Sequence, residues 1–159
     1  MAEPIRERIF DKIVTLLQGI TVANGYRQDV KQVIRKHLWL EDISGDNLPT
    51  LMVLPAAAEN SKTYEELDGG EIDGYMGVAI VCMVVATDTV PVTLALERLI
   101  ADVEIALTQD FNLGLGSALV KDVRDMGIIA DLFPGTADMN RGYAETLYKV
   151  WFVYTRGNP

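Results

Sequence analysis

The longest unbroken apolar run in this chain covers nine residues, 78–86, and is rich in valine and isoleucine. A helix that crosses a bilayer needs about 20 such residues, so the run indicates no membrane span. A β-branched strand that is apolar on both faces has to be covered on both sides. The sequence therefore predicts a strand over residues 75–86 in the centre of a sheet.

Two segments carry apolar side chains at the spacing of an amphipathic helix. The first covers residues 4–18, with Pro4 suited to the opening turn and Gly19 placed to end it. The second is expected to run from a capping Thr89 to about Gln109. Its apolar stripe consists of Val92, Leu96, Leu99, Ile100, Val103 and Leu107. The charged residues outside that stripe are Glu97, Arg98, Asp102 and Glu104.

The other apolar segments are predicted to be strands, separated by turn signals such as Asn24-Gly25. They cover residues 30–38, 50–54, 119–133 and 143–155. A helix is the competing interpretation of the first, and a break near Gly127 is expected in the third. Pro55 should end the second strand or lie at a sheet edge. In the last strand one face is expected to pack on the core, and it carries Tyr148, Val150, Phe152 and Tyr154.

The order of these elements, helix, strands, helix, strands, lacks the alternation of a doubly wound fold. We therefore expect an α+β fold in which two helices cover one face of a mainly antiparallel sheet of about four to six strands. At 159 residues the chain is expected to form a single domain over residues 1–159. The polar, glycine-containing stretch 56–71 is long enough to be a loop or arm.

The chain offers few groups for catalysis or metal binding. With one cysteine and one histidine, neither an internal disulfide nor the usual zinc ligand sets can form. Cys82 should behave as a small hydrophobe within its strand, and His37 should lie at the surface. The pattern Gly114-Leu115-Gly116 follows a helix and lacks the third glycine and the lysine of phosphate-binding loops, so a loop is expected there.

The acidic residues form no recognised site. Residues 68–74 gather carboxylates and glycines, but their spacing departs from the calcium-loop template, so a solvated turn is preferred to a calcium site. Asp122, Asp125 and Asp131 are expected to point outward from a strand instead of forming an acid and base pair. We therefore expect no enzyme activity, no catalytic, cofactor or metal residue, and no bound cofactor.

The net charge of the chain limits the classes of partner that it can bind. Twenty-three acidic and 14 basic residues give a formal charge of −9 and a pI near 4.5. Such a chain should not bind phosphate backbones non-specifically, so a free-standing DNA-binding protein is disfavoured. Residues 1–8 show no basic segment followed by an apolar one, so a cytoplasmic location without membrane contact is expected.

One resemblance to a known family goes beyond these arguments. The opening residues 9–21 (IFDKIVTLLQGIT) are followed by Asn24-Gly25-Tyr26, by Asp29-Val30 and by a proline before the short apolar strand 49–54. This pattern resembles the small tail terminator, or tail completion, proteins of tailed bacteriophages. The strand at 72–86 and the second amphipathic helix continue the same layout.

The resemblance implies a non-enzymatic virion protein, assembled in the host cytoplasm and located in the phage tail. Such a protein forms a homo-oligomeric ring, expected to be hexameric, that caps the tail tube protein, ends tube growth and meets the neck or head-completion protein. DNA passes through its pore without sequence-specific binding, and an acidic wall would suit that passage.

Contacts between subunits or with tube and neck are expected from the arm at 56–71 and from loops at 109–117 and 134–142. The interface residues proposed there are Tyr64, Glu65, Glu66, Asp68, Phe111, Asn112, Phe133, Asp138 and Arg141. A head-completion or tube-like phage protein is the nearest alternative. A small dimeric α+β domain that binds a regulatory ligand is a second one.

Overall fold

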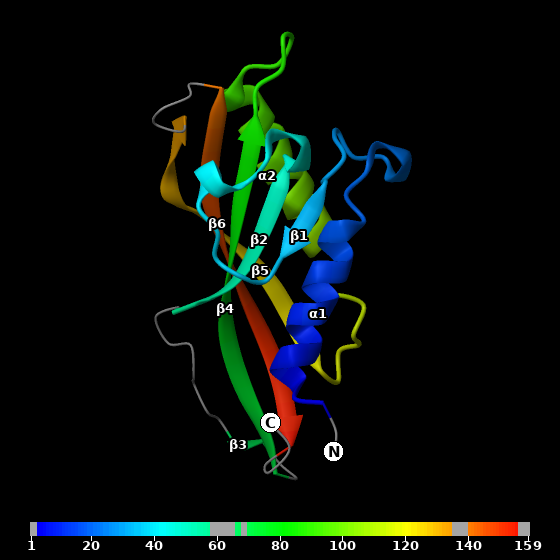
Figure 1. The fold of residues 1–159 in the computed structure, drawn as a ribbon. Helices are drawn as coiled ribbons and strands as arrows, with labels where there is room; N and C mark the ends of the chain where they lie inside the picture. Colours follow the sequence, from blue (N-terminus) through cyan, green and yellow to red (C-terminus); the bar gives the residue numbers. More distant parts are fainter. Residues whose placement is uncertain (1–2, 58–65, 68–69, 135–139, 156–159) are drawn as a thin grey trace.

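The structure, a computed structural model, describes residues 3–57, 66–67, 70–134 and 140–155. Its two helices and six strands form an α+β fold, as the order of sequence elements predicts (Figure 1). The helices are α1 (Ile5–Gln18) and α2 (Val92–Thr108). The strands are β1 (Gln32–Ile34), β2 (Thr50–Ala56), β3 (Glu66–Leu67), β4 (Glu71–Val85), β5 (Val120–Pro134) and β6 (Arg141–Thr155).

The strands pair in the order β1-β2-β4-β6-β5, and β3 pairs with the first residues of β4. All pairs are antiparallel except β1 with β2. The apolar strand β4 lies between β2 and β6, so its predicted central position is confirmed. It begins at Glu71 instead of residue 75, because Glu71 to Gly74 pair with the end of β6.

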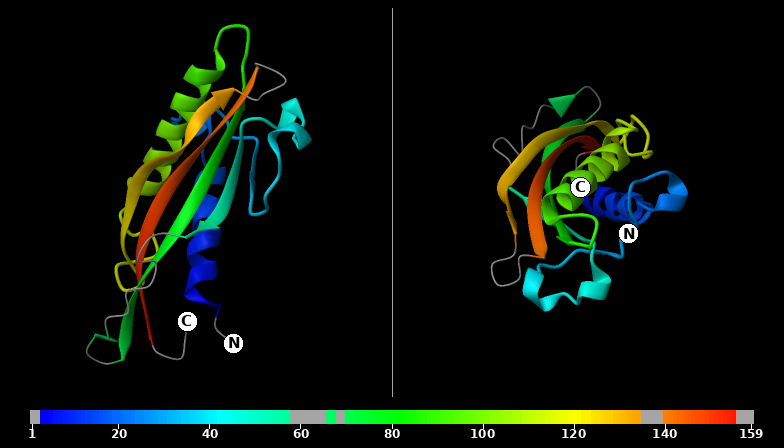
Figure 2. Two further views of the ribbon diagram at one scale, coloured as in Figure 1. Left: turned by 90° about the vertical axis from the view of Figure 1, so that its left-hand side faces the viewer. Right: turned by 90° about the horizontal axis from the view of Figure 1, so that it is seen from above.

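The main core lies between the sheet and the two helices, which cover the same face (Figure 2). Alternate residues of β4, such as Ile80 and Cys82, point into this core beside Ile9 of α1 and Leu99 of α2. The predicted packing of Tyr148, Val150 and Phe152 on one face of β6 is confirmed, since all three are buried in this core.

The start of α2 differs from the prediction. The helix begins at Val92, directly after Pro91, and no side chain caps it. Thr89 is therefore not the cap. Thr87 closes the preceding turn instead, because its hydroxyl accepts a hydrogen bond from the backbone N–H of Val90 at 3.1 Å.

The opposite face of the sheet is partly covered by residues 35–48, which contain the short 3-10 helices η2 (Leu40–Asp42) and η3 (Gly45–Asn47). Leu40, Ile43 and Leu48 are buried there in a second, smaller apolar cluster. The sheet residues of this cluster are Met52, Val81 and Met83. The strand predicted over 30–38 is therefore shortened to β1, because the chain leaves the sheet after Ile34 to form this cover, and the competing helix does not form.

The turn and edge signals agree with the structure in most places. A third 3-10 helix, η1 (Val22–Asn24), ends at Gly25, which has a φ of +90° as the Asn-Gly turn predicts. Pro55 pairs only with β4, beyond the reach of β1, so it lies at an edge as expected. The break expected near Gly127 is a shift of register inside a strand that continues to Pro134. Neither helix in the described part of the chain is long and apolar enough to cross a membrane.

Candidate interaction surface

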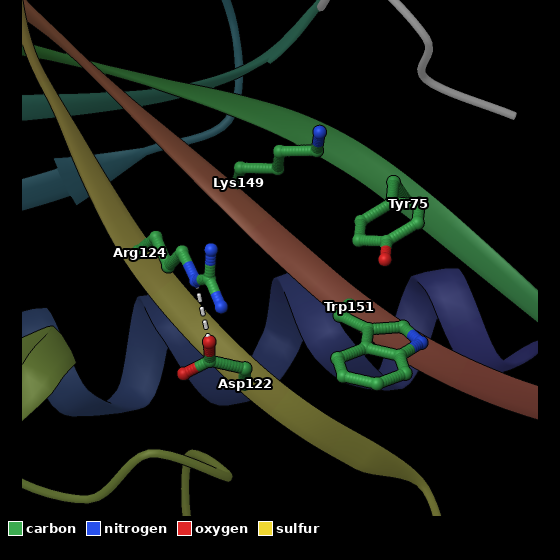
Figure 3. A pocket seen from close by; sticks show the side chains of 5 residues that line it. All are labelled: Tyr75, Asp122, Arg124, Lys149 and Trp151. Carbon is green, nitrogen blue, oxygen red and sulfur yellow. Dashed lines mark hydrogen bonds and ion pairs between the residues drawn. The ribbon is translucent and has the colours of Figure 1, made fainter. Parts of the chain in front are cut away.

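A small pocket lies on the face of the sheet opposite the helices, on three neighbouring strands (Figure 3). Its volume is about 130 Å³, and its lining residues are Tyr75, Asp122, Arg124, Lys149 and Trp151. Tyr75 of β4 pairs with Trp151 of β6, which pairs with Asp122 of β5. Because side chains alternate along a strand, Lys149 and Trp151 point away from the core that holds Tyr148 and Val150. We call this site the sheet pocket.

Two aromatic rings form one side of the sheet pocket. The rings of Tyr75 and Trp151 stack with centroids 5.9 Å apart and planes inclined by 23°. The indole N–H of Trp151 donates a hydrogen bond of 3.1 Å to a carboxylate oxygen of Asp73, which is itself buried. The Trp151 ring is thereby fixed in the wall of the pocket.

Two cations lie on the other side (Figure 3). The Nζ atom of Lys149 lies 4.5 Å from the centroid of the Tyr75 ring, a cation–π contact. Arg124 Nε donates a hydrogen bond of 2.6 Å to Asp122, and this bond raises the pKa of the exposed guanidinium above its ordinary value. Within the described residues, Lys149 makes no ion pair and Arg124 pairs only through Nε with Asp122, so both cations can still bind an anion.

The neighbouring strand β5 forms an edge of the sheet. It pairs with β6 on one side, and no strand of the described chain pairs with its other side. Three apolar side chains near its middle, Met126, Ile128 and Ile129, are each about half exposed, at 52%, 50% and 50%. They flank a bulge at Gly127, where φ is +89°. Unpaired edges of this kind can add a strand from another chain, and we call these three residues and their backbone the β5 edge.

A row of three carboxylates lies at the start of α1, two of them in the helix and one, Glu3, just before it. The carboxylates of Glu3, Glu7 and Asp11 are exposed, and one oxygen of each lies within 4.8 Å of the others. Arg35 neutralises Asp11 through a 2.7 Å ion pair, whereas Glu3 and Glu7 contact no cation among the described residues. These are the described residues best arranged to hold a cation, although exposed carboxylates on one helix face often hold none. We call them the α1 acidic stripe.

The interface residues proposed from the sequence are scattered over the fold. Phe111 is 55% exposed in the turns after α2, and Asn112 stabilises those turns by accepting a 2.9 Å hydrogen bond from the Gly114 N–H. Arg141 instead makes contacts within the chain, donating to the carbonyl oxygens of Leu40 and Ile43 at 3.3 and 2.7 Å.

The side chains of the other six proposed interface residues are not described. Glu66 lies in β3 and Phe133 in β5, where only their backbone is described. Tyr64, Glu65, Asp68 and Asp138 lie outside the described residues. Phe111, Asn112 and Arg141, the three whose side chains the structure describes, do not line the sheet pocket.

The other sequence hypotheses can be placed in the structure. Cys82 is buried in the core, and burial raises the pKa of its thiol to about 12, which supports its structural role. His37 is exposed and contacts the edge of Trp39, with ring centroids 4.8 Å apart. Gly114 and Gly116 have φ values of +70° and +88° in the predicted loop. In the part of 68–74 that is described, the buried carboxylate of Asp73 is bonded to Trp151 and so does not point into solvent.

One charged residue was placed wrongly. Asp102, expected outside the apolar stripe of α2, has a fully buried side chain. It accepts hydrogen bonds from Arg27, at 3.0 Å from the backbone N–H and at 2.8 Å from the guanidinium. An isolated carboxylate is rarely buried, and this pairing explains why Asp102 can face the protein.

Comparison with family models gave no match, and no curated protein was found to be similar. The functional proposal therefore depends on the surfaces described above and on the resemblance seen in the sequence.

Proposed function

We propose that the chain is a structural subunit that joins copies of itself into a closed ring, expected to be hexameric. The ring would cap a phage tail tube, end its growth and offer a surface to the neck or head-completion protein. The observation that carries this proposal is the β5 edge, where an unpaired backbone and half-exposed apolar side chains occur together. Charged side chains often protect such an edge, and β5 carries four of them over residues 121–125 but none over residues 126–130.

A ring follows when one surface of a subunit meets a different surface of the next, and the rotation between them closes after a fixed number of copies. Such a ring would end a tube because, unlike a tube protein, it offers no surface on which a further ring can stack. The formal charge of −9 is compatible with DNA sliding through the centre without adhering. Shape and association would then perform the whole function, without chemistry by any side chain.

The test is to disrupt the β5 edge and measure assembly. A variant with Ile128→Lys and Ile129→Lys should remain folded but lose the ring, because buried lysines would oppose strand addition. Val22→Lys is a matched control, since Val22 is 57% exposed in η1, which precedes β1 at the opposite edge of the sheet from β5. Light scattering after gel filtration and negative-stain images would report ring formation by each protein, alone and with uncapped tail tubes.

Three outcomes decide between the candidates. Rings from the wild type and the Val22 control, but not from the β5 variant, would support the proposal. Stacks that lengthen without limit would instead favour a tube-like protein. A stable compact dimer would favour the small ligand-binding domain, a candidate that the sheet pocket itself makes reasonable.

A further inference from the structure

We propose that the sheet pocket of one copy receives the α1 acidic stripe of the next copy. The inference rests on the proposed function, because it names the charged contact that would set the orientation of neighbours in the ring. Asp122 and Arg124 of the pocket share β5 with the β5 edge, but Lys149 and the α1 acidic stripe lie on other elements, so the charged contact and the edge contact can be disrupted separately.

The first argument is charge complementarity. In a chain with a charge of −9, the pocket places two cations, Lys149 and Arg124, within one small cavity. Their only anionic neighbour in the pocket is Asp122, which binds Arg124 through Nε and leaves the terminal nitrogens of the guanidinium available. A planar guanidinium with two free nitrogens suits a carboxylate, which it can bind through both oxygens.

The second argument is the repulsion among the carboxylates of the α1 acidic stripe. Three carboxylates within 4.8 Å repel one another, and one arginine pairs with only one of them. An approaching pair of cations would relieve this repulsion. Among the described residues, the stripe is also the densest group of carboxylates, since no other group of three metal-ligating side chains lies this close together.

The third argument is placement. On a helix, Glu7 projects about 200° around the axis from the buried Ile5 and Ile9, so the stripe points away from the sheet. The sheet pocket lies on the opposite face of that sheet, because its residues Lys149 and Trp151 alternate with the core residues Tyr148 and Val150. Two complementary surfaces on opposite sides of one molecule cannot bind each other within a chain. They join copies head to tail, the kind of contact that can close into a ring.

The aromatic side of the pocket suits the same occupant. A glutamate presents two methylene groups before its carboxylate, and these can pack beside the stacked rings of Tyr75 and Trp151 while the carboxylate meets Lys149 and Arg124 (Figure 3). Desolvation by the rings would strengthen the ion pairs. The aromatic side therefore favours Glu3 or Glu7 over the shorter Asp11.

Charge reversal on each side gives a direct test. Lys149→Glu places a carboxylate in the pocket, and Glu7→Lys places a cation on the stripe. Either variant alone should associate roughly tenfold or more weakly than the wild type, because like charges would meet at each contact. Arg98→Glu and Glu97→Lys, both on the exposed side of α2, are the matched controls and should assemble normally.

Mixing the two variants provides the decisive result. In an alternating ring, each reversed pocket meets a reversed stripe and each normal pocket meets a normal stripe, so all contacts become complementary again. Rings should therefore return in the mixture, and also in a single chain that carries both changes. Circular dichroism would confirm that each variant is folded, and Lys149→Gln with Arg124→Gln replaces the reversal if Lys149→Glu does not fold.

The possible failures are distinguishable. If the wild type forms rings and the reversals assemble as well as it does, the pocket contact is refuted while the ring survives. If both reversals weaken assembly and the mixture does not recover, the pocket binds something other than the stripe, such as a tube-protein carboxylate, and the inference is again refuted. If the wild type never assembles, both proposals are wrong.

Discussion

Removing the Arg27 guanidinium should measurably destabilise the fold. The chain between α1 and β1 is tied to α2 by Arg27, whose backbone and side chain both bind Asp102. The Asp102 side chain is fully buried, whereas that of Arg27 is 50% exposed. Arg27→Ala deletes the 2.8 Å bond to one carboxylate oxygen and leaves the 3.0 Å bond from the backbone to the other.

The loss of stability in Arg27→Ala depends on the hydrogen bond to Asp102 that remains. Losing a hydrogen bond to a buried charged group costs about 1.5–3 kcal/mol, and removing one partner of a wholly buried ion pair costs about 3–5 kcal/mol. Because Arg27 is half exposed and the backbone bond survives, we expect a loss near the lower range, about 2 kcal/mol. For a chain of this length that corresponds to a fall in Tm of about 4–8 °C.

Urea unfolding of Arg27→Ala, Asp102→Ala and the double variant would measure both the cost and the coupling. Arg27→Ala should lose about 2 kcal/mol, and Asp102→Ala at least as much because it removes both hydrogen bonds. The double variant should lose less than their sum, since the two residues share one interaction. Arg98→Ala, exposed on the same helix, is the control and should change little. Losses below about 0.5 kcal/mol, the usual size for a surface substitution, would show that the buried carboxylate does not depend on Arg27.

Three further predictions concern the core. Gly74→Ala should destabilise the protein by about 1–3 kcal/mol, because the added Cβ would lie 2.7 Å from the buried ring of Phe152. Adding Phe152→Leu to this variant should recover part of the loss, and a Gly74→Ala variant as stable as the wild type would refute the clash. Tyr148→Phe should change stability by less than about 1 kcal/mol in thermal unfolding, since the buried Tyr148 hydroxyl makes no well-formed hydrogen bond among the described residues and the nearby Thr146 hydroxyl donates to the Ile80 carbonyl. A larger loss would reveal a partner. Native Cys82 should react with a thiol reagent only after denaturation, and rapid labelling of the native protein would contradict its burial. Because burial raises the pKa of Cys82 from 9.0 to about 12, unfolding above pH 9 releases a proton, so the free energy of unfolding should fall as pH rises. The fall should be less steep in Cys82→Ala, and an equal slope in both proteins would contradict this.

The sequence predicted the elements with strong periodicity. The apolar run 78–86, the stripe of α2 and the alternation of β6 each bury a continuous face, so pattern and structure agree there. Residues 35–48 could not be predicted in the same way. Leu40, Ile43 and Leu48 have irregular spacing, and their burial depends on the particular sheet residues that they cover.

The sheet pocket required information that a sequence does not carry directly. Its residues come from three strands, and their meeting depends on strand order and register, which turn signals do not fix. One clue was available, because assigning Tyr148 and Val150 to the core places Lys149 and Trp151 on the opposite face. Asp102 also gave a signal, since it lies only about 60° around the helix from Leu99, inside the apolar side.

Hydrogen exchange of the β5 amides tests the ring most directly. It would be measured for the assembled protein and for the folded variant with Ile128→Lys and Ile129→Lys. If copies join through the β5 edge, amides facing outward within residues 120–134 should exchange markedly more slowly in the assembly, while those of α1 and α2 that contact no neighbour stay unchanged. Equal exchange of β5 in both proteins would contradict the proposal that this edge is buried between subunits.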